Sequence, residues 1–142
     1  MTPKDVLDYA WDWFEYHAGQ RMVAFRFFLI LLSALVLGVA TVLKDGQYGL
    51  ASAVAGFGAF ISFAFLMLEL RNEALVNVGR TALLYVERSD EALKATPLQL
   101  LHSDRNRSIL TSHKLWLRAI YTVSAILFLI AAVSPRIVLG QR

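Results

Sequence analysis

Two long apolar runs constrain the fold of this chain more than any other feature of its sequence. They cover residues 27–43 and 50–68, contain no charged residue, and are separated only by residues 44–49. At about 1.5 Å of rise per residue, a helix over either run comes close to the roughly 30 Å of a bilayer's hydrocarbon core. Lipid offers the backbone no hydrogen-bond partners, so runs of this kind cross it as helices. The sequence therefore predicts a two-helix transmembrane hairpin.

The composition supports a membrane protein and excludes several other classes. Of the 142 residues, 57% are hydrophobic and only 18% are charged, and the mean hydropathy is +0.53. The absence of cysteine excludes disulfides, thiolate metal sites and a cysteine nucleophile. The net charge of +3 is modest and acids are mixed with bases along the chain, so nucleic acid is not an expected partner.

We expect a single all-α membrane domain over residues 1–142. Its parts are an amphipathic N-terminal helix (1–23), a first span (24–43), a second span (50–70), cytoplasmic helices (71–114) and a third span (115–134). The last apolar stretch has two interpretations, because only residues 119–133 are free of charge. Either it crosses the membrane while Arg118 and Arg136 reach back to the headgroups, or it forms a re-entrant or surface helix.

The segments outside the spans also show helical patterns. Residues 1–23 place four acids on one helical face and aromatic rings on another, so this helix either lies in the membrane interface or continues straight into the first span. The acids are Asp5, Asp8, Asp12 and Glu15. A further helix is expected from residue 69 to about residue 94. The capping-box pattern at residues 96–99 predicts another helix start, and residues 102–108 are typical of a loop.

The distribution of Lys and Arg predicts the orientation. The N-terminal segment and the segment between the second and third apolar stretches together hold eleven of them, whereas the other side holds Lys44, Arg136 and Arg142. Positive charge concentrates on the cytoplasmic side of membrane proteins. We therefore expect a multi-pass protein of the bacterial inner membrane with its N-terminus in the cytoplasm and its C-terminus in the periplasm.

Polar residues gather where the two predicted spans meet the cytoplasm. In an antiparallel helix pair that turns near residue 46, Arg26 lies at the depth of Glu69, and Arg21 lies at the depth of Glu73. These pairs form interhelical ion pairs within or between protomers, or all four side chains are solvated helix ends. A polar motif at the same boundary consists of His17, Gln20, Arg21, Arg71 and Asn72.

Small residues recur at helical spacing inside both apolar runs. Such residues let helices approach closely where lipid cancels the hydrophobic driving force. The residues expected to pack in this way are Ala34, Gly38, Ser52, Ala55, Gly56 and Ala59. They offer more contact faces than one hairpin needs, so self-association is expected.

Motifs for catalysis or metal binding are missing from the sequence. It has no Gly-rich phosphate loop and no nucleophile elbow, and its three histidines have no second ligand at helical spacing. We therefore expect no enzyme activity, no metal and no cofactor. The first two spans carry no ionisable residue at mid-membrane, which argues against a pump or carrier. An oligomeric pore lined by hydroxyl groups stays open as an alternative, with Ser33, Thr41, Ser52 and Ser62 as its lining.

Two stretches carry a resemblance to a known family. The first reads Trp13-Phe14-x-x-His17-Ala18-x-Gln20-Arg21-x-x-x-Phe25-x-Phe27-Phe28-Leu29, and the second reads Leu68-Glu69-x-Arg71-Asn72-x-x-Leu75-x-x-x-Gly79-x-x-Ala82-Leu83-x-x-x-Glu87. Over residues 11–134 the chain resembles small bacterial membrane proteins labelled RipA-family octameric membrane protein. That family often has Asn where Arg26 stands and Glu where Arg80 stands. The resemblance implies a homo-oligomer of the inner membrane, possibly an octamer by its label, without known catalysis.

The layout of two spans followed by a long cytoplasmic helix is also similar to that of SLATT domains, pore-forming effectors predicted in bacterial nucleotide-triggered defence. Two functions are therefore expected. The first is a non-enzymatic, homo-oligomeric inner-membrane protein that forms a ring-like assembly, structural or pore-like, with lipid and its own copies as partners. The alternative is a SLATT-like pore-forming effector of a defence system.

Overall fold

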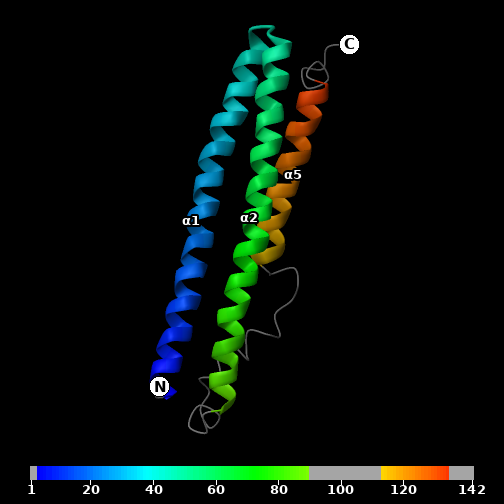
Figure 1. Cartoon of the computed structure of the whole chain (residues 1–142). Coiled ribbons are helices and arrows are strands. Elements are labelled where there is room, and N and C mark those ends of the chain that lie inside the picture. Colours follow the sequence, from blue (N-terminus) through cyan, green and yellow to red (C-terminus); the bar gives the residue numbers. More distant parts are fainter. Residues whose placement is uncertain (1–2, 90–112, 135–142) are drawn as a thin grey trace. The chain divides into compact units, whose positions relative to one another are not determined.

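Three α-helices make up the part of the chain that the structure, a computed structural model, describes, namely residues 3–89 and 113–134. They are α1 (Pro3–Lys44), α2 (Tyr48–Ser89) and α5 (His113–Val133) (Figure 1). The described residues contain no strand, and all three helices are long and apolar enough to cross a membrane. The helix start predicted at residues 96–99 and the loop predicted at residues 102–108 lie outside the described residues.

α1 and α2 each extend well beyond the apolar run from which they were predicted. Each helix has 42 residues. Pro3 suits the first turn of α1 because its missing N–H would have no partner there, and Asp5 places a negative charge at the positive end of the helix dipole. The amphipathic N-terminal segment therefore continues into the first apolar run without a break, as one of the two alternatives had it.

A tight turn links α1 to α2. Gly46 adopts a left-handed conformation with φ of 73°, which a residue with a Cβ rarely adopts. The Gly46 N–H donates to the Leu43 carbonyl at 3.0 Å, and the Gln47 N–H donates to the Val42 carbonyl at 3.1 Å. This pair of bonds is a Schellman motif, which satisfies carbonyl groups that the end of α1 would otherwise leave open. Gly46 thereby ends α1, and α2 begins at Tyr48.

The chain divides into two compact units. The first comprises Met1–Met22 and Leu70–Leu115, and the second comprises Val23–Glu69 and Trp116–Arg142. In the first unit α1 and α2 pack around the buried side chains of Ala10, Val76 and Leu83.

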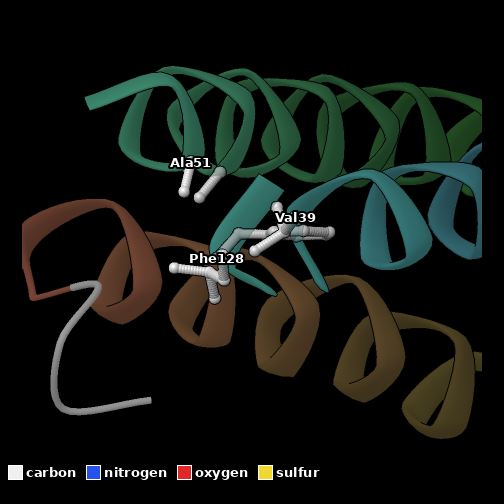
Figure 2. Close-up of a cluster of buried hydrophobic side chains, with 5 residues drawn as sticks. Val39, Ala51 and Phe128 are labelled. Atoms are coloured by element: carbon white, nitrogen blue, oxygen red, sulfur yellow. The ribbon is translucent and has the colours of Figure 1, made fainter. Parts of the chain in front are cut away.

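The second unit has a core between all three helices. One buried cluster joins α1, α2 and α5 through Val39, Leu43, Ala51, Ala55 and Phe128. Figure 2 shows Val39 and Phe128 lying close together, with Ala51 beside them. In a second cluster, the rings of Phe28 and Tyr121 lie edge to face, with their centroids 4.6 Å apart.

These contacts fix the directions of the helices within the second unit. Gly38 lies beside Val54 and Phe28 beside Phe65, so α1 and α2 are antiparallel there. Phe28 meets Tyr121 and Val39 meets Phe128, so α5 runs parallel to α1. In the most apolar 18-residue stretch of each helix, only 11% of the residues of α1, 22% of those of α2 and 28% of those of α5 are buried inside the chain. Most of the apolar surface therefore faces outward, where lipid or other copies can cover it.

Candidate functional site

A buried polar cluster lies in the first unit. Glu73 is buried, and its Oε1 lies 3.2 Å from the Lys114 Nζ at the start of α5. Lys114 Nζ also donates to the Asn77 Oδ1 at 3.2 Å. Glu73 and Asn77 are four residues apart, so both lie on one face of α2. One lysine therefore links the start of α5 to two consecutive turns of α2.

Two more polar residues of this unit, Arg21 and Asn72, are buried as well. A charged group rarely stays buried without a partner, because losing its hydration costs several kcal/mol. Removing one partner of a buried ion pair lowers the stability of the protein by roughly 3–5 kcal/mol. We call Glu73, Asn77 and Lys114, which the contacts of the lysine join, the polar cluster.

Of the four residues predicted to form interhelical ion pairs, the structure buries Arg21, Glu69 and Glu73 and leaves Arg26 exposed. The pairs Arg21–Glu73 and Arg26–Glu69 stay predictions. The Lys114 contact to Glu73 was not predicted. A signal for it does exist, because Lys114 immediately precedes the third apolar stretch and sits at the same membrane boundary.

The predicted polar boundary motif separates into a buried and an exposed part. Arg21 and Asn72 are buried, and His17 is half-buried. Gln20 and Arg71 are exposed, and Gln20 Nε2 donates to the Tyr16 hydroxyl at 2.7 Å. The motif therefore does not form one continuous surface.

Close helix packing next to the polar cluster involves both stretches of the family resemblance. Trp13 Nε1 donates to the Leu75 carbonyl at 3.1 Å. A Cβ at Gly79 would lie 3.0 Å from Trp13 Cδ1 and 3.2 Å from Phe14 Cα, so a larger residue there would require α1 to move by a few tenths of an ångström. The His17 ring lies against the Trp13 ring at a tilt of 56°, with ring centroids 4.6 Å apart. This contact leaves the His17 Nδ1 buried, without a hydrogen-bond partner among the described residues.

The predicted helix-packing residues also fall into two groups. Ala55 is fully buried, and Ala59 packs against the core cluster. A Cβ built on Gly38 would lie 3.7 Å from Val54 Cγ1, an ordinary van der Waals contact. Ala34 is exposed, while Ser52 and Gly56 are half-buried. A Cβ at Gly56 would meet no heavy atom within 4 Å. The inward group packs the chain itself, and the outward group is open to lipid or another copy.

The tightest contact in the second unit involves a glycine outside that predicted set. A Cβ at Gly58 would lie 2.7 Å from Phe128 Cδ1, so the Phe128 ring occupies the place where any other side chain would begin. Nearby Ser62 is buried and donates to the Gly58 carbonyl at 2.9 Å. Gly58 therefore sets how closely α5 docks on α2.

An apolar cavity of about 470 Å³ lies between α1 and α5 in the second unit. Its lining consists of Leu32, Val36, Val39, Ala40, Leu43, Ser124, Leu127, Phe128 and Ala131. Ser124 contributes the one hydroxyl in this lining, so the cavity has little to recognise a polar ligand. Among residues 3–89 and 113–134, no group of three or more His, Cys, Asp or Glu side chains is arranged to hold a metal ion.

Comparison with known proteins gives one informative relative. The chain is similar to CD-NTase-associated protein 19 of Escherichia coli, with 36% identity over 91 residues. The matched region covers 61% of this chain and 60% of that protein, so the chain spans well under two thirds of its relative. No family model matches the chain, and no solved structure matches it. These results give no specific support to the RipA-family resemblance.

Proposed function

We propose that this protein is a non-enzymatic membrane effector of a bacterial defence system that contains a CD-NTase, a nucleotidyltransferase. The observation that carries the proposal is the 36% identity to a CD-NTase-associated protein. The three membrane-length helices of this chain support a membrane target for its action. Of the two functions expected from the sequence, the defence effector is therefore the one we favour.

Self-association is part of the proposal. A chain of 15.9 kDa with three spans is too small to enclose a path for ions alone, so permeabilisation needs several copies. The large outward apolar surface is suitable for contacts between copies. A ring of copies in the inner membrane, with the N-terminus in the cytoplasm, agrees with the Lys and Arg distribution.

A phage challenge tests the proposal. The full chain is expressed with a bacterial CD-NTase, and the matched control carries a catalytically inactive form of that nucleotidyltransferase. After infection we expect propidium iodide to enter cells that hold both active proteins, followed by growth arrest that limits phage release. Equal dye entry with the inactive nucleotidyltransferase, or no dye entry in any strain, would contradict the proposal.

The mass of the detergent-solubilised particle tests self-association separately. We expect a single species whose protein mass is a multiple of 15.9 kDa. A monomer both before and after addition of the nucleotidyltransferase's product would remove the assembly from the proposal.

A further inference from the structure

We infer that the outward face of α1 in the second unit lines a water-filled pore that favours anions. The inference rests on the proposed membrane effector and adds which residues meet the permeating ion and what its charge is. Arg26, Ile30, Ser33, Leu37, Thr41 and Lys44 form this face, which we call the α1 stripe.

The spacing of these residues places them in one line along the helix. They follow one another at intervals of four, three, four, four and three residues, and all six are exposed. Positions three, four and seven apart share one face of an α-helix. The opposite side of α1 packs inward, where Phe28, Val39 and Leu43 are buried.

The outward faces of the other two helices differ in chemistry. On α2 the large exposed side chains include Phe57, Phe60, Phe63 and Met67, and on α5 they include Val123, Ile126, Leu129 and Ile130. In this part of the chain α5 adds one exposed hydroxyl, that of Thr122, and one exposed cation, Arg118, near its N-terminal end. Aromatic and aliphatic faces of this kind are at home in acyl chains, whereas the α1 stripe combines two cations with two hydroxyls.

The structure also separates the four hydroxyl residues that the sequence offered for a pore. Ser62 is buried and Ser52 is half-buried, whereas Ser33 and Thr41 are exposed. The Ser33 hydroxyl donates to the Leu29 carbonyl at 2.8 Å, and the Thr41 hydroxyl donates to the Leu37 carbonyl at 2.9 Å. With their protons engaged, the two oxygens keep lone pairs that accept hydrogen bonds from water.

Charge gives the expected selectivity. Arg26 and Lys44 are 18 residues apart, or about 27 Å along the helix, which places a cation near each end of a hydrocarbon core of roughly 30 Å. α1 carries no acidic residue between them, and Asp45 lies beyond, in the turn. In a symmetric assembly each cation becomes a ring, and rings of Arg or Lys favour anions. Leu37, exposed by 68%, supplies an apolar ring between the two hydroxyl positions.

Cysteine accessibility tests the stripe directly, because the full chain has no cysteine of its own. Single variants Ser33→Cys, Phe60→Cys and Ile126→Cys are reconstituted in vesicles. Contacts of Phe28 and Gly38 with α2 put Phe60 at the depth of Ser33, so Phe60→Cys is a depth-matched control. Each is treated with an anionic and a cationic methanethiosulfonate, which react with the thiolate and hence need water.

We expect Ser33→Cys to react at least about tenfold faster than Phe60→Cys and Ile126→Cys, because a thiolate forms in water and not in acyl chains. After correction for intrinsic reactivity, the anionic reagent should be at least about fivefold faster at Ser33→Cys than the cationic one. Arg26→Gln should reduce that preference, whereas Arg88→Gln, which lies outside the stripe, should leave it unchanged. Thr41→Cys provides a second position should Ser33→Cys fail to assemble.

Two results would overturn the inference. If Ser33→Cys and Thr41→Cys react as slowly as Phe60→Cys, the α1 stripe faces lipid, even where phage-dependent dye entry upholds the proposed function. If the anionic and cationic reagents react equally, the stripe meets water without selecting charge. If Ser33→Cys and Thr41→Cys both react quickly but no dye enters cells in the phage challenge, the result counts against the proposed function alone.

Discussion

Replacing Gly58 with alanine should destabilise the protein, because the contact between α2 and α5 leaves no room for a Cβ. Such a Cβ would lie 2.7 Å from Phe128 Cδ1 and 2.8 Å from Phe128 Cγ. Attractive carbon–carbon contacts need about 3.5–4.0 Å, so the ring must move away by about 1 Å. Overpacking of a close-packed core costs about 1–3 kcal/mol.

Gly56 provides a matched control on the same helix. Alanine in place of glycine inside a helix gains up to about 1 kcal/mol through backbone entropy. Both variants carry this gain, but the Cβ at position 56 would meet nothing within 4 Å. The difference in unfolding free energy between Gly58→Ala and Gly56→Ala therefore isolates the packing cost, about 1–3 kcal/mol.

Thermal unfolding of the detergent-solubilised full chain measures this difference. We expect Gly58→Ala to melt at least about 3 °C below Gly56→Ala. In the Gly58→Ala background, Phe128→Leu should cost less than it does alone, since the smaller side chain removes the clash. Equal melting temperatures for the two alanine variants would refute the reasoning, because the Phe128 ring would then not occupy the space above Gly58.

Three further outcomes are expected. Lys114→Met and Glu73→Gln should each lower the unfolding free energy by about 1–2 kcal/mol, which is less than for a fully buried pair because Lys114 is partly exposed to solvent. Strictly additive losses in a double-mutant cycle would mean that the pair does not interact. Trp13→Phe keeps an aromatic ring but loses the N–H hydrogen bond to the Leu75 carbonyl, so it should lower the unfolding free energy by about 1 kcal/mol in the same melting assay. An unchanged melting temperature would mean that this hydrogen bond does not stabilise the protein. If all three helices cross the membrane, a periplasm-dependent reporter fused after Arg142 should be active. A cytoplasmic location of that end would mean that α5 does not cross.

The helices could be predicted because their signals are local. Charge-free apolar runs and the short linker with Gly46 are visible in the sequence, and the same features form α1, the turn and α2. Where α5 docks is not a local property. The sequence does not say that Phe128 rests on Gly58 or that Lys114 reaches Glu73, because both contacts join residues far apart in the chain.

The same limit applies to the candidate pore residues. Ser33 and Ser62 are alike in sequence terms, since each is a single hydroxyl inside an apolar run. The docking of α5 against α1 and α2 buries Ser62 and leaves Ser33 on the open side. Helical periodicity could group Arg26, Ser33 and Lys44 on one face, but it could not show that this face stays uncovered.

The turn between α1 and α2 affects how the chain enters a bilayer. For a chain that inserts as proposed, this turn is a segment that must pass through to the far side. Its backbone groups are already paired by the bonds at Gly46 and Gln47, and its charges are those of Lys44 and Asp45 alone. Moving one charge through 100 mV of membrane potential involves about 2.3 kcal/mol, but a lysine and an aspartate that move together cancel. The resting potential neither pulls this turn across nor holds it back, so its translocation is electrically silent.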